Sequence, residues 1–420
     1  MHAEPITCYR PRPEVAAAFA SLPYDVFDRA EARSYVDAHP GSFLAIDRPE
    51  TSFAPDHDPY ASDVYERARE LLEARMADGT LLRDEVPCYY LYRLRQDGRE
   101  QTGIVCACAL DDYADGTIRR HELTRRDKED DRVRHIEATG CQTGPIFLAY
   151  RDSPACEALV EAEKSAEPLY DFTDELGVQQ SVWRVALPTA VNSLDALLGH
   201  VERTYIADGH HRAASAARVC QELREARSAG TQDASAREPY DSLLCVLFPA
   251  SQLRVLPYNR VVADVAGLSE PELVGALERT GLTVGSRRDA PVTPERRGVF
   301  GMYAFGAWRE LSLAGSLPAG PVEALDVSIL QDRVLGPVLD IDDPRGDPRV
   351  DFVGGAAGPA ELERRAGEGG VAFSLFATSV EELMEVADAG RLMPPKSTWF
   401  EPKLRSGLFI RRIMESDPRG

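Results

Sequence analysis

A strand-to-helix turn in the middle of the chain is its most informative feature: residues 205–215 read Tyr-Ile-Ala-Asp-Gly-His-His-Arg-Ala-Ala-Ser. The apolar run Thr204–Ala207 predicts a buried strand that stops at Asp208, and the Ala-rich segment after Gly209 predicts a helix. The first turn of a helix presents backbone N–H groups and the positive end of the helix dipole. We therefore expect an anion-binding site at this turn.

The side chains of the turn suit the chemistry of phosphate groups. Gly209 lets the backbone approach a ligand closely, and Arg212 can donate to two phosphate oxygens. Asp208 supplies a carboxylate that suits either a Mg²⁺ ligand or a proton acceptor. His210 and His211 could stabilise transferred negative charge. The structural alternative is that Asp208 is a helix N-cap followed by an exposed His-His-Arg segment.

Composition limits the classes of function. A chain of 420 residues predicts two domains or one large elaborated domain. The net charge of −21 argues against nucleic acid as the main partner, although a small phosphorylated ligand needs only a local basic cluster. No apolar stretch resembles a signal peptide or spans a bilayer, and the scattered cysteines are typical of reduced thiols. These features predict a cytoplasmic protein with no membrane partner.

Local patterns predict a mixed α/β fold. Apolar spacing over 59–78 predicts a helix, and the runs 88–94 and 103–110 predict a hairpin around Asp97-Gly98. The stretch 226–238 predicts an exposed loop. We expect an N-terminal mixed α/β region at 1–250 that carries the Asp-Gly-His-His-Arg turn. An α/β subdomain at 251–330 and a C-terminal region at 331–420 that returns to the site would follow.

Several further segments carry candidate site residues. The small, hydroxylated stretch with Thr143 and Gly144 could line a phosphate or a carboxylate, and Glu122 or Asp25 could act as a base. Each of these also has a plain structural interpretation as a loop or a solvated charged segment. The remaining candidates are basic or hydroxyl-bearing residues that could complete a charge clamp or bind substrate, namely Tyr24, Arg48, Lys128, Arg132, Lys396, Ser397 and Thr398.

The whole chain resembles the domain-of-unknown-function family 1015. Five stretches match the pattern of that family in order: 22–26, 121–124 with Lys128 and Arg132, 207–212, 326–330 and 393–398. The name of this family implies no activity.

The Asp-Gly-His-His-Arg stretch also resembles the ParB/sulfiredoxin superfamily, in which this position binds nucleotide phosphates. Free-serine kinases of that superfamily carry a very similar stretch and an upstream Glu that activates the substrate hydroxyl. The resemblance implies a ParB/sulfiredoxin-like nucleotide-binding core with additional α/β elements. It also implies Glu122 in the role of that upstream Glu.

The leading hypothesis is a small-molecule kinase that moves phosphate from ATP or ADP to the hydroxyl of free L-serine, with Mg²⁺ as cofactor. The chain lacks a Gly-x-x-x-x-Gly-Lys-Ser/Thr loop and the protein-kinase signatures, which argues against both of those classes. Two alternatives share the same residues: a nucleotide-binding regulatory protein of ParB type, and a phosphohydrolase that uses the His pair. All three have a nucleotide or small molecule as partner, and the sequence leaves a homo-oligomer open.

Overall fold

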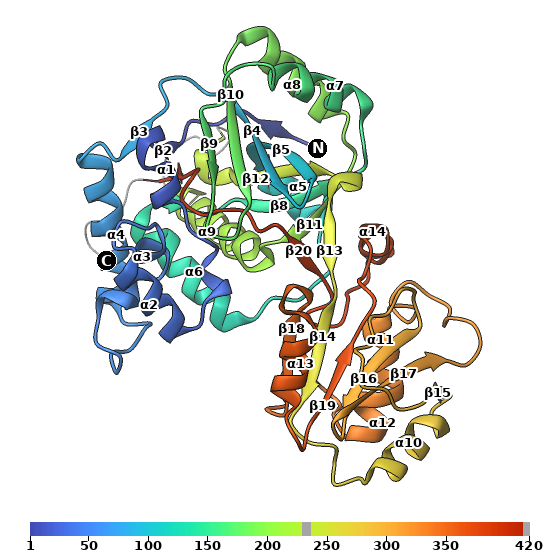
Figure 1. The fold of residues 1–420 in the computed structure, drawn as a ribbon. Coiled ribbons are helices and arrows are strands. Elements are labelled where there is room, and N and C mark those ends of the chain that lie inside the picture. Colours follow the sequence, from blue (N-terminus) through green and yellow to red (C-terminus); the bar gives the residue numbers. More distant parts are fainter. Residues whose placement is uncertain (229–236, 415–420) are drawn as a thin grey trace. The chain divides into compact units, whose positions relative to one another are not determined.

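The computed structural model describes residues 1–228 and 237–414, and it confirms the mixed α/β class (Figure 1). The chain divides into two compact units, one made of Met1–Arg120, Thr124–Leu253 and the chain from Pro402 onward. The other unit contains His121–Leu123 and Arg254–Glu401. The loop expected at 226–238 falls mainly on residues outside the described ranges.

The first unit is built on a nine-stranded mixed sheet with the order β6-β11-β8-β12-β5-β4-β10-β9, in which β1 also pairs with β5. Every residue of the central strand β12 is buried, because its apolar run Leu243–Phe248 is covered on both faces. The strands are β1 (Ala3–Glu4), β4 (Tyr89–Gln96), β5 (Arg99–Ala109), β6 (Ile118–Arg119), β8 (Ile146–Tyr150), β9 (Tyr170–Thr173), β10 (Gln179–Val185), β11 (Thr204–Asp208) and β12 (Ser242–Pro249).

Helices follow several of these strands. Helix α9 buries Ala213, Ala216, Val219 and Cys220, and this spacing of three and four residues places one apolar stripe against the core. Helix α6 packs against α9, and α7 packs against α8. The helical segments are α5 (Leu110–Ala114), α6 (Arg126–Thr139), α7 (Pro154–Glu163), α8 (Pro188–Gly199), α9 (His210–Ser228), η3 (Pro239–Asp241) and η4 (Ala250–Gln252).

The N-terminal segments form a smaller core around Phe19, Phe43 and Ile46. Gly79 ends the helix expected at 59–78 with a φ of +76°, a conformation that favours glycine. These elements are β2 (Tyr9–Pro11), α1 (Pro13–Phe19), η1 (Tyr24–Val26), α2 (Arg29–Ala38), α3 (Leu44–Asp47), η2 (Pro49–Ser52), α4 (Ser62–Ala77) and β3 (Leu81–Arg83), with β7 (Cys141–Gln142) paired to β21 (Arg411–Arg412).

The predicted hairpin is confirmed in detail. The hairpin β4–β5 turns at Asp97 and Gly98, which both have a positive φ as a tight two-residue turn requires. The close pair Cys106 and Cys108 lies in the core on β5, with the two sulfurs 3.7 Å apart. Among the described residues, no helix is both long and apolar enough to cross a membrane.

The second unit contains a six-stranded sheet with the order β15-β17-β16-β19-β14-β18. Some of its strands come from residues 251–330 and others from the chain after residue 331. One sheet therefore combines the two regions that the sequence predicted as separate. The elements are β13 (Arg254–Leu256), β14 (Tyr258–Val262), α10 (Glu270–Arg279), β15 (Leu282–Val284), β16 (Val299–Ala304), β17 (Ala307–Leu313), α11 (Asp326–Leu330), η5 (Gln331–Leu335), α12 (Gly336–Leu339), β18 (Val350–Gly354), η6 (Gly355–Ala357), α13 (Gly358–Ala366), β19 (Val371–Ser374), α14 (Val380–Asp388) and β20 (Trp399–Glu401).

Asp326 opens α11, the segment 326–330 that the sequence singled out as a family match. Its side chain is buried, and Oδ1 accepts a hydrogen bond of 2.8 Å from the backbone N–H of Gly298. Burial raises the pKa of Asp326 to about 7, although the Gly298 N–H opposes this shift. Asp326 therefore ties α11 to the turn before β16 at the cost of a buried titrating carboxyl group.

We predict that Asp326→Asn removes a pH dependence from the stability of the second unit. The folded pKa is about 7 and the ordinary value is 3.8, so the proton stabilises the unit below pH 3.8 and this contribution is lost as the pH rises to 7. Relative to wild type, the variant should gain about 2–3 kcal/mol in unfolding free energy between pH 5 and pH 8. Urea unfolding at both pH values measures this difference, and an equal difference at both would contradict the assignment.

Candidate active site

The predicted strand-to-helix turn is present, and a bulge shapes it. Strand β11 ends at Asp208 and α9 begins at His210, while the register of β11 against β8 shifts between Ile206 and Asp208. Such a bulge redirects the side chains that follow it. Gly209 has a φ of +94°, and its carbonyl accepts the first helical hydrogen bond, from Ala213 at 3.0 Å. Gly209 is thus the N-cap, and the alternative in which Asp208 caps the helix is wrong.

The Asp208 carboxylate lies between two cations. Lys403 Nζ donates to Oδ2 at 3.1 Å, and Arg212 Nη2 lies 4.0 Å from Oδ1. Burial would raise the pKa of Asp208, but Lys403 first and then Arg212 hold it well below its usual range. The side chain keeps 26% of its exposure, so this ionised carboxylate remains accessible from one side.

Two glycines leave room for the Arg212 guanidinium. A Cβ on Gly209 would lie 3.0 Å from Arg212 Nε, and a Cβ on Gly144 would lie 3.3 Å from Nη1. Arg212 Nη1 also donates to the carbonyl of Pro145. The guanidinium is therefore held between the loop before β8 and the start of α9.

The histidine pair occupies the first turn of α9. The Nε2 atom of His211 accepts a hydrogen bond of 3.0 Å from the backbone N–H of Arg125, which fixes the ring against the segment before α6. His210 is buried, and a positive charge on its ring would further lower the pKa of Asp208. The catalytic roles of both histidines stay predictions.

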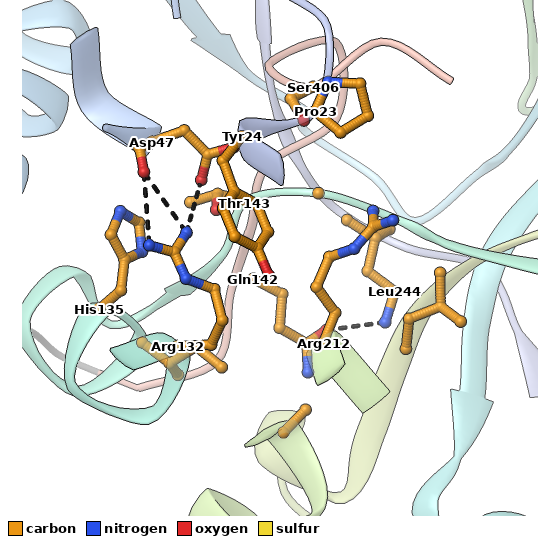
Figure 2. A pocket seen from close by; sticks show the side chains of 14 residues that line it. Pro23, Tyr24, Asp47, Arg132, His135, Gln142, Thr143, Arg212, Leu244 and Ser406 are labelled. Atoms are coloured by element: carbon orange, nitrogen blue, oxygen red, sulfur yellow. Dashed lines mark hydrogen bonds and ion pairs between the residues drawn. The ribbon is translucent and has the colours of Figure 1, made fainter. Parts of the chain in front are cut away.

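A small pocket adjoins the turn, and it brings together five of the candidate residues: Tyr24, Arg132, Thr143, Gly144 and Arg212 (Figure 2). Its cavity volume is about 30 Å³, which is enough to hold ordered water. The pocket is also lined by Pro23, Asp47, His135, Ile136, Gln142, Ile146, Ala216, Leu244 and Ser406.

The Arg132 guanidinium lies against the face of the Tyr24 ring, and both side chains line the pocket. Figure 2 shows Arg132 on one side of this ring and Arg212 on the other; the Arg132 guanidinium carbon lies 4.1 Å from the ring centroid. Arg132 is buried and pairs with Asp47 at 3.1 Å and Asp131 at 2.9 Å. Arg132 therefore lines the pocket while its guanidinium is held by two carboxylates.

Two other predicted substrate residues lie around the pocket without lining it. Arg48 donates to the carbonyls of Tyr24 and Phe27 at 2.9 and 2.8 Å, so it braces the short turn that presents Tyr24. Asp25 is exposed on that turn and is not among the lining residues. Direct substrate contacts of Arg48 and Asp25 stay predictions.

Glu122 and the 396–398 loop belong to the second unit, which brings their segments together. The carbonyl of His121 accepts a hydrogen bond of 2.7 Å from the N–H of Met393. Lys396 has a φ of +54°, and Arg260 holds its carbonyl at 2.9 Å. The roles of Glu122, Lys396, Ser397 and Thr398 at the site stay predictions.

Sequence reasoning missed Lys403, Ser406, His135 and Gln142. Gln142 is buried and fixes its amide between the carbonyl of Ser242 (2.8 Å) and the N–H of Leu244 (2.7 Å). Lys403 contacts Asp208 from 195 residues away in the sequence. No local pattern marks these residues, because their place depends on which distant segments pack against the turn.

Comparison with known proteins identifies the family. Residues 3–328 match the family model described as "Protein of unknown function (DUF1015)", and the chain belongs to this family. No curated protein matches the chain.

Several solved structures show distant likeness. A free serine kinase in complex with AMP is 17% identical, with 70% of this chain and 86% of that chain covered and a TM-score of 0.35. A conserved hypothetical protein from Pyrococcus furiosus is 16% identical, with 73% and 95% covered and a TM-score of 0.36. C-terminally truncated SbnI from Staphylococcus aureus is 14% identical, with 73% and 87% covered and a TM-score of 0.37.

We predict that Gly209→Ala destabilises the first unit by about 1–2 kcal/mol, because an alanine at a φ of +94° is strained. The new methyl group would also displace the Arg212 guanidinium, which should weaken binding of tripolyphosphate. Urea unfolding and calorimetric titration measure the two effects. Gly199→Ala is the matched control, since nothing lies within 4 Å of its Cβ position. Equal behaviour of the two variants would refute the role of Gly209.

Proposed function

We propose that this protein is a small-molecule kinase that transfers phosphate from ATP or ADP to the hydroxyl of a free amino acid, with L-serine as the acceptor. The observation that carries the proposal is a concentration of positive charge in a chain of net charge −21. Arg212 and Lys403 converge on one carboxylate at the N-terminus of α9, where the helix dipole adds further positive potential.

Phosphoryl transfer needs placement and charge stabilisation more than covalent chemistry by the protein. The bond from the terminal phosphorus to its bridging oxygen breaks, and a bond to the acceptor oxygen forms while the hydroxyl loses its proton. Arg212 would hold the transferred group next to the amides that open α9. His210 and His211 would border the same turn, and Asp208 would orient these cations.

The acceptor would enter beside Tyr24, Thr143 and Gly144, which border Arg212 in the small pocket. Glu122 would orient or deprotonate the acceptor hydroxyl, in line with the resemblance of the Asp-Gly-His-His-Arg stretch to free-serine kinases. Lys396, Ser397 and Thr398 would bind nucleotide. The Ser397 hydroxyl already donates to the carbonyl of Pro394 at 2.6 Å, so it would contribute as an acceptor or through its backbone.

The surroundings of Asp208 do not suit a magnesium ion. Mg²⁺ favours several oxygen ligands, but Asp208 is held by Lys403 at 3.1 Å with Arg212 at 4.0 Å. Two cations thus surround the one carboxylate that would bind the metal. The described residues around Asp208 in the first unit do not fit Mg²⁺ in this arrangement, and we assign no step to a metal there.

We predict that the purified protein forms a new phosphomonoester when mixed with Mg²⁺, ATP or ADP, and L-serine. Asp208→Ala and Glu122→Ala should lower turnover at least 100-fold, because one removes the carboxylate of the turn and the other the base. Phosphorus NMR measures the product, and omission of single acceptors identifies the substrate. Glu202→Ala is the control, since this exposed carboxylate precedes β11 in the same unit.

Other outcomes of this experiment would replace the proposal. Free phosphate without a new ester would favour the phosphohydrolase. Unchanged nucleotide that nevertheless binds in calorimetry would favour the regulatory protein. Full activity of Asp208→Ala, with its fold intact by circular dichroism, would remove the turn from the reaction.

A further inference from the structure

Lys403 reaches the site from a segment whose backbone is fixed. Ser406 exchanges two backbone hydrogen bonds with Ser21, at 2.8 and 3.2 Å. Gly407 has a φ of +86°, and a Cβ there would lie 2.6 Å from the Phe43 ring. The segment therefore packs in a single close-fitting path against the N-terminal core.

Arg405 fixes the same segment from inside the protein. Its side chain is 1% exposed and pairs with Asp174 at 2.6 Å and with Glu175 at 2.8 Å. Its backbone N–H also donates to the Tyr92 hydroxyl at 3.2 Å. Because the residues after Lys403 are held this firmly, the backbone of the segment directs the Lys403 side chain toward Asp208.

Two cations contact one carboxylate at the turn. Lys403 and Arg212 bring two positive charges, whereas Asp208 brings one negative charge. The N-terminus of the 19-residue helix α9 adds a partial positive charge, which makes it an unfavourable place for cations. These cations lie beside the pocket that Arg212 lines, and an incoming anion would interact favourably with them.

Of the two cations, Lys403 is the one that can change partner. Arg212 passes between Gly144 and Gly209 and donates to the Pro145 carbonyl, so its guanidinium is confined. Lys403 ends in a compact ammonium group on a flexible four-carbon chain, and its donors rotate freely. A terminal phosphate also carries more negative charge than the single carboxylate of Asp208, so it attracts the ammonium more strongly at equal distance.

We infer that Lys403 is a mobile catalytic cation: its ammonium is held by Asp208 in the free protein and moves to the terminal phosphate when nucleotide binds. This inference rests on the proposed kinase function. Lys403 then supplies, next to Arg212, the second positive charge that the transferred phosphoryl group requires. When Lys403 leaves, Asp208 loses the main partner that keeps its pKa low, so nucleotide binding raises the pKa of this carboxyl group.

The test compares Lys403→Met, Lys403→Arg and Asp208→Asn with wild type, by calorimetry with ATP, ADP and AMP and by phosphorus NMR turnover. Lys403→Met should lower ATP affinity and kcat/KM at least tenfold, with a smaller loss for AMP, and Lys403→Arg should restore part of both. Asp208→Asn should bind ATP as tightly as wild type or more tightly, because it releases Lys403, while its turnover falls. Lys164→Met is the control, since Lys164 is similarly buried and pairs with Glu161 at 2.7 Å away from the turn.

Each result separates the inference from the function on which it rests. Wild type that neither binds nucleotide nor forms an ester overturns both. Active wild type with an equally active Lys403→Met overturns the inference alone. Equal loss of affinity for all three nucleotides would show that Lys403 only supports the structure, and weaker ATP binding by Asp208→Asn would show that Asp208 itself binds the ligand.

Discussion

The contact between the Lys403 ammonium and the Asp208 carboxylate, 3.1 Å long, is the interaction on which the candidate site depends. It joins the end of a central strand to a segment that returns to the first unit after the chain has built the whole second unit. Asp208 stays ionised at the positive end of α9 because two cations lower its pKa against the effect of burial. Without these cations the turn would present a carboxylate alone at the positive end of α9.

Small residues and fixed backbone let this charge cluster form. Gly209 and Gly144 leave space for the Arg212 guanidinium, and the bulge in β11 turns the end of the strand. Two further arginines hold the turn that carries Tyr24: Arg132 lies against the Tyr24 ring, and Arg48 donates to the Tyr24 carbonyl. The first unit thus gathers several basic side chains around one turn in a chain of net charge −21.

The sequence identified part of the candidate site but not the residues that support it. Tyr24, Thr143, Gly144 and Arg212 do line one pocket, because each comes from a motif with its own recognisable chemistry. Arg48 donates to two backbone carbonyls of the neighbouring turn, and its contact with substrate stays a prediction. The sequence does not distinguish an arginine that contacts a ligand from one that holds a loop. Only the packing around the side chain distinguishes the two.

The sequence by itself determined the local structure: the mixed α/β class, the strand-to-helix turn at Asp208-Gly209 and the hairpin at Asp97-Gly98. These depend on apolar periodicity and on positive φ angles that few residues tolerate, and both are properties of neighbouring residues. Only the tertiary structure decided that strands before and after residue 331 share one sheet and that Lys403 meets Asp208. Such pairings depend on how distant segments pack together, and local sequence patterns do not predict this packing.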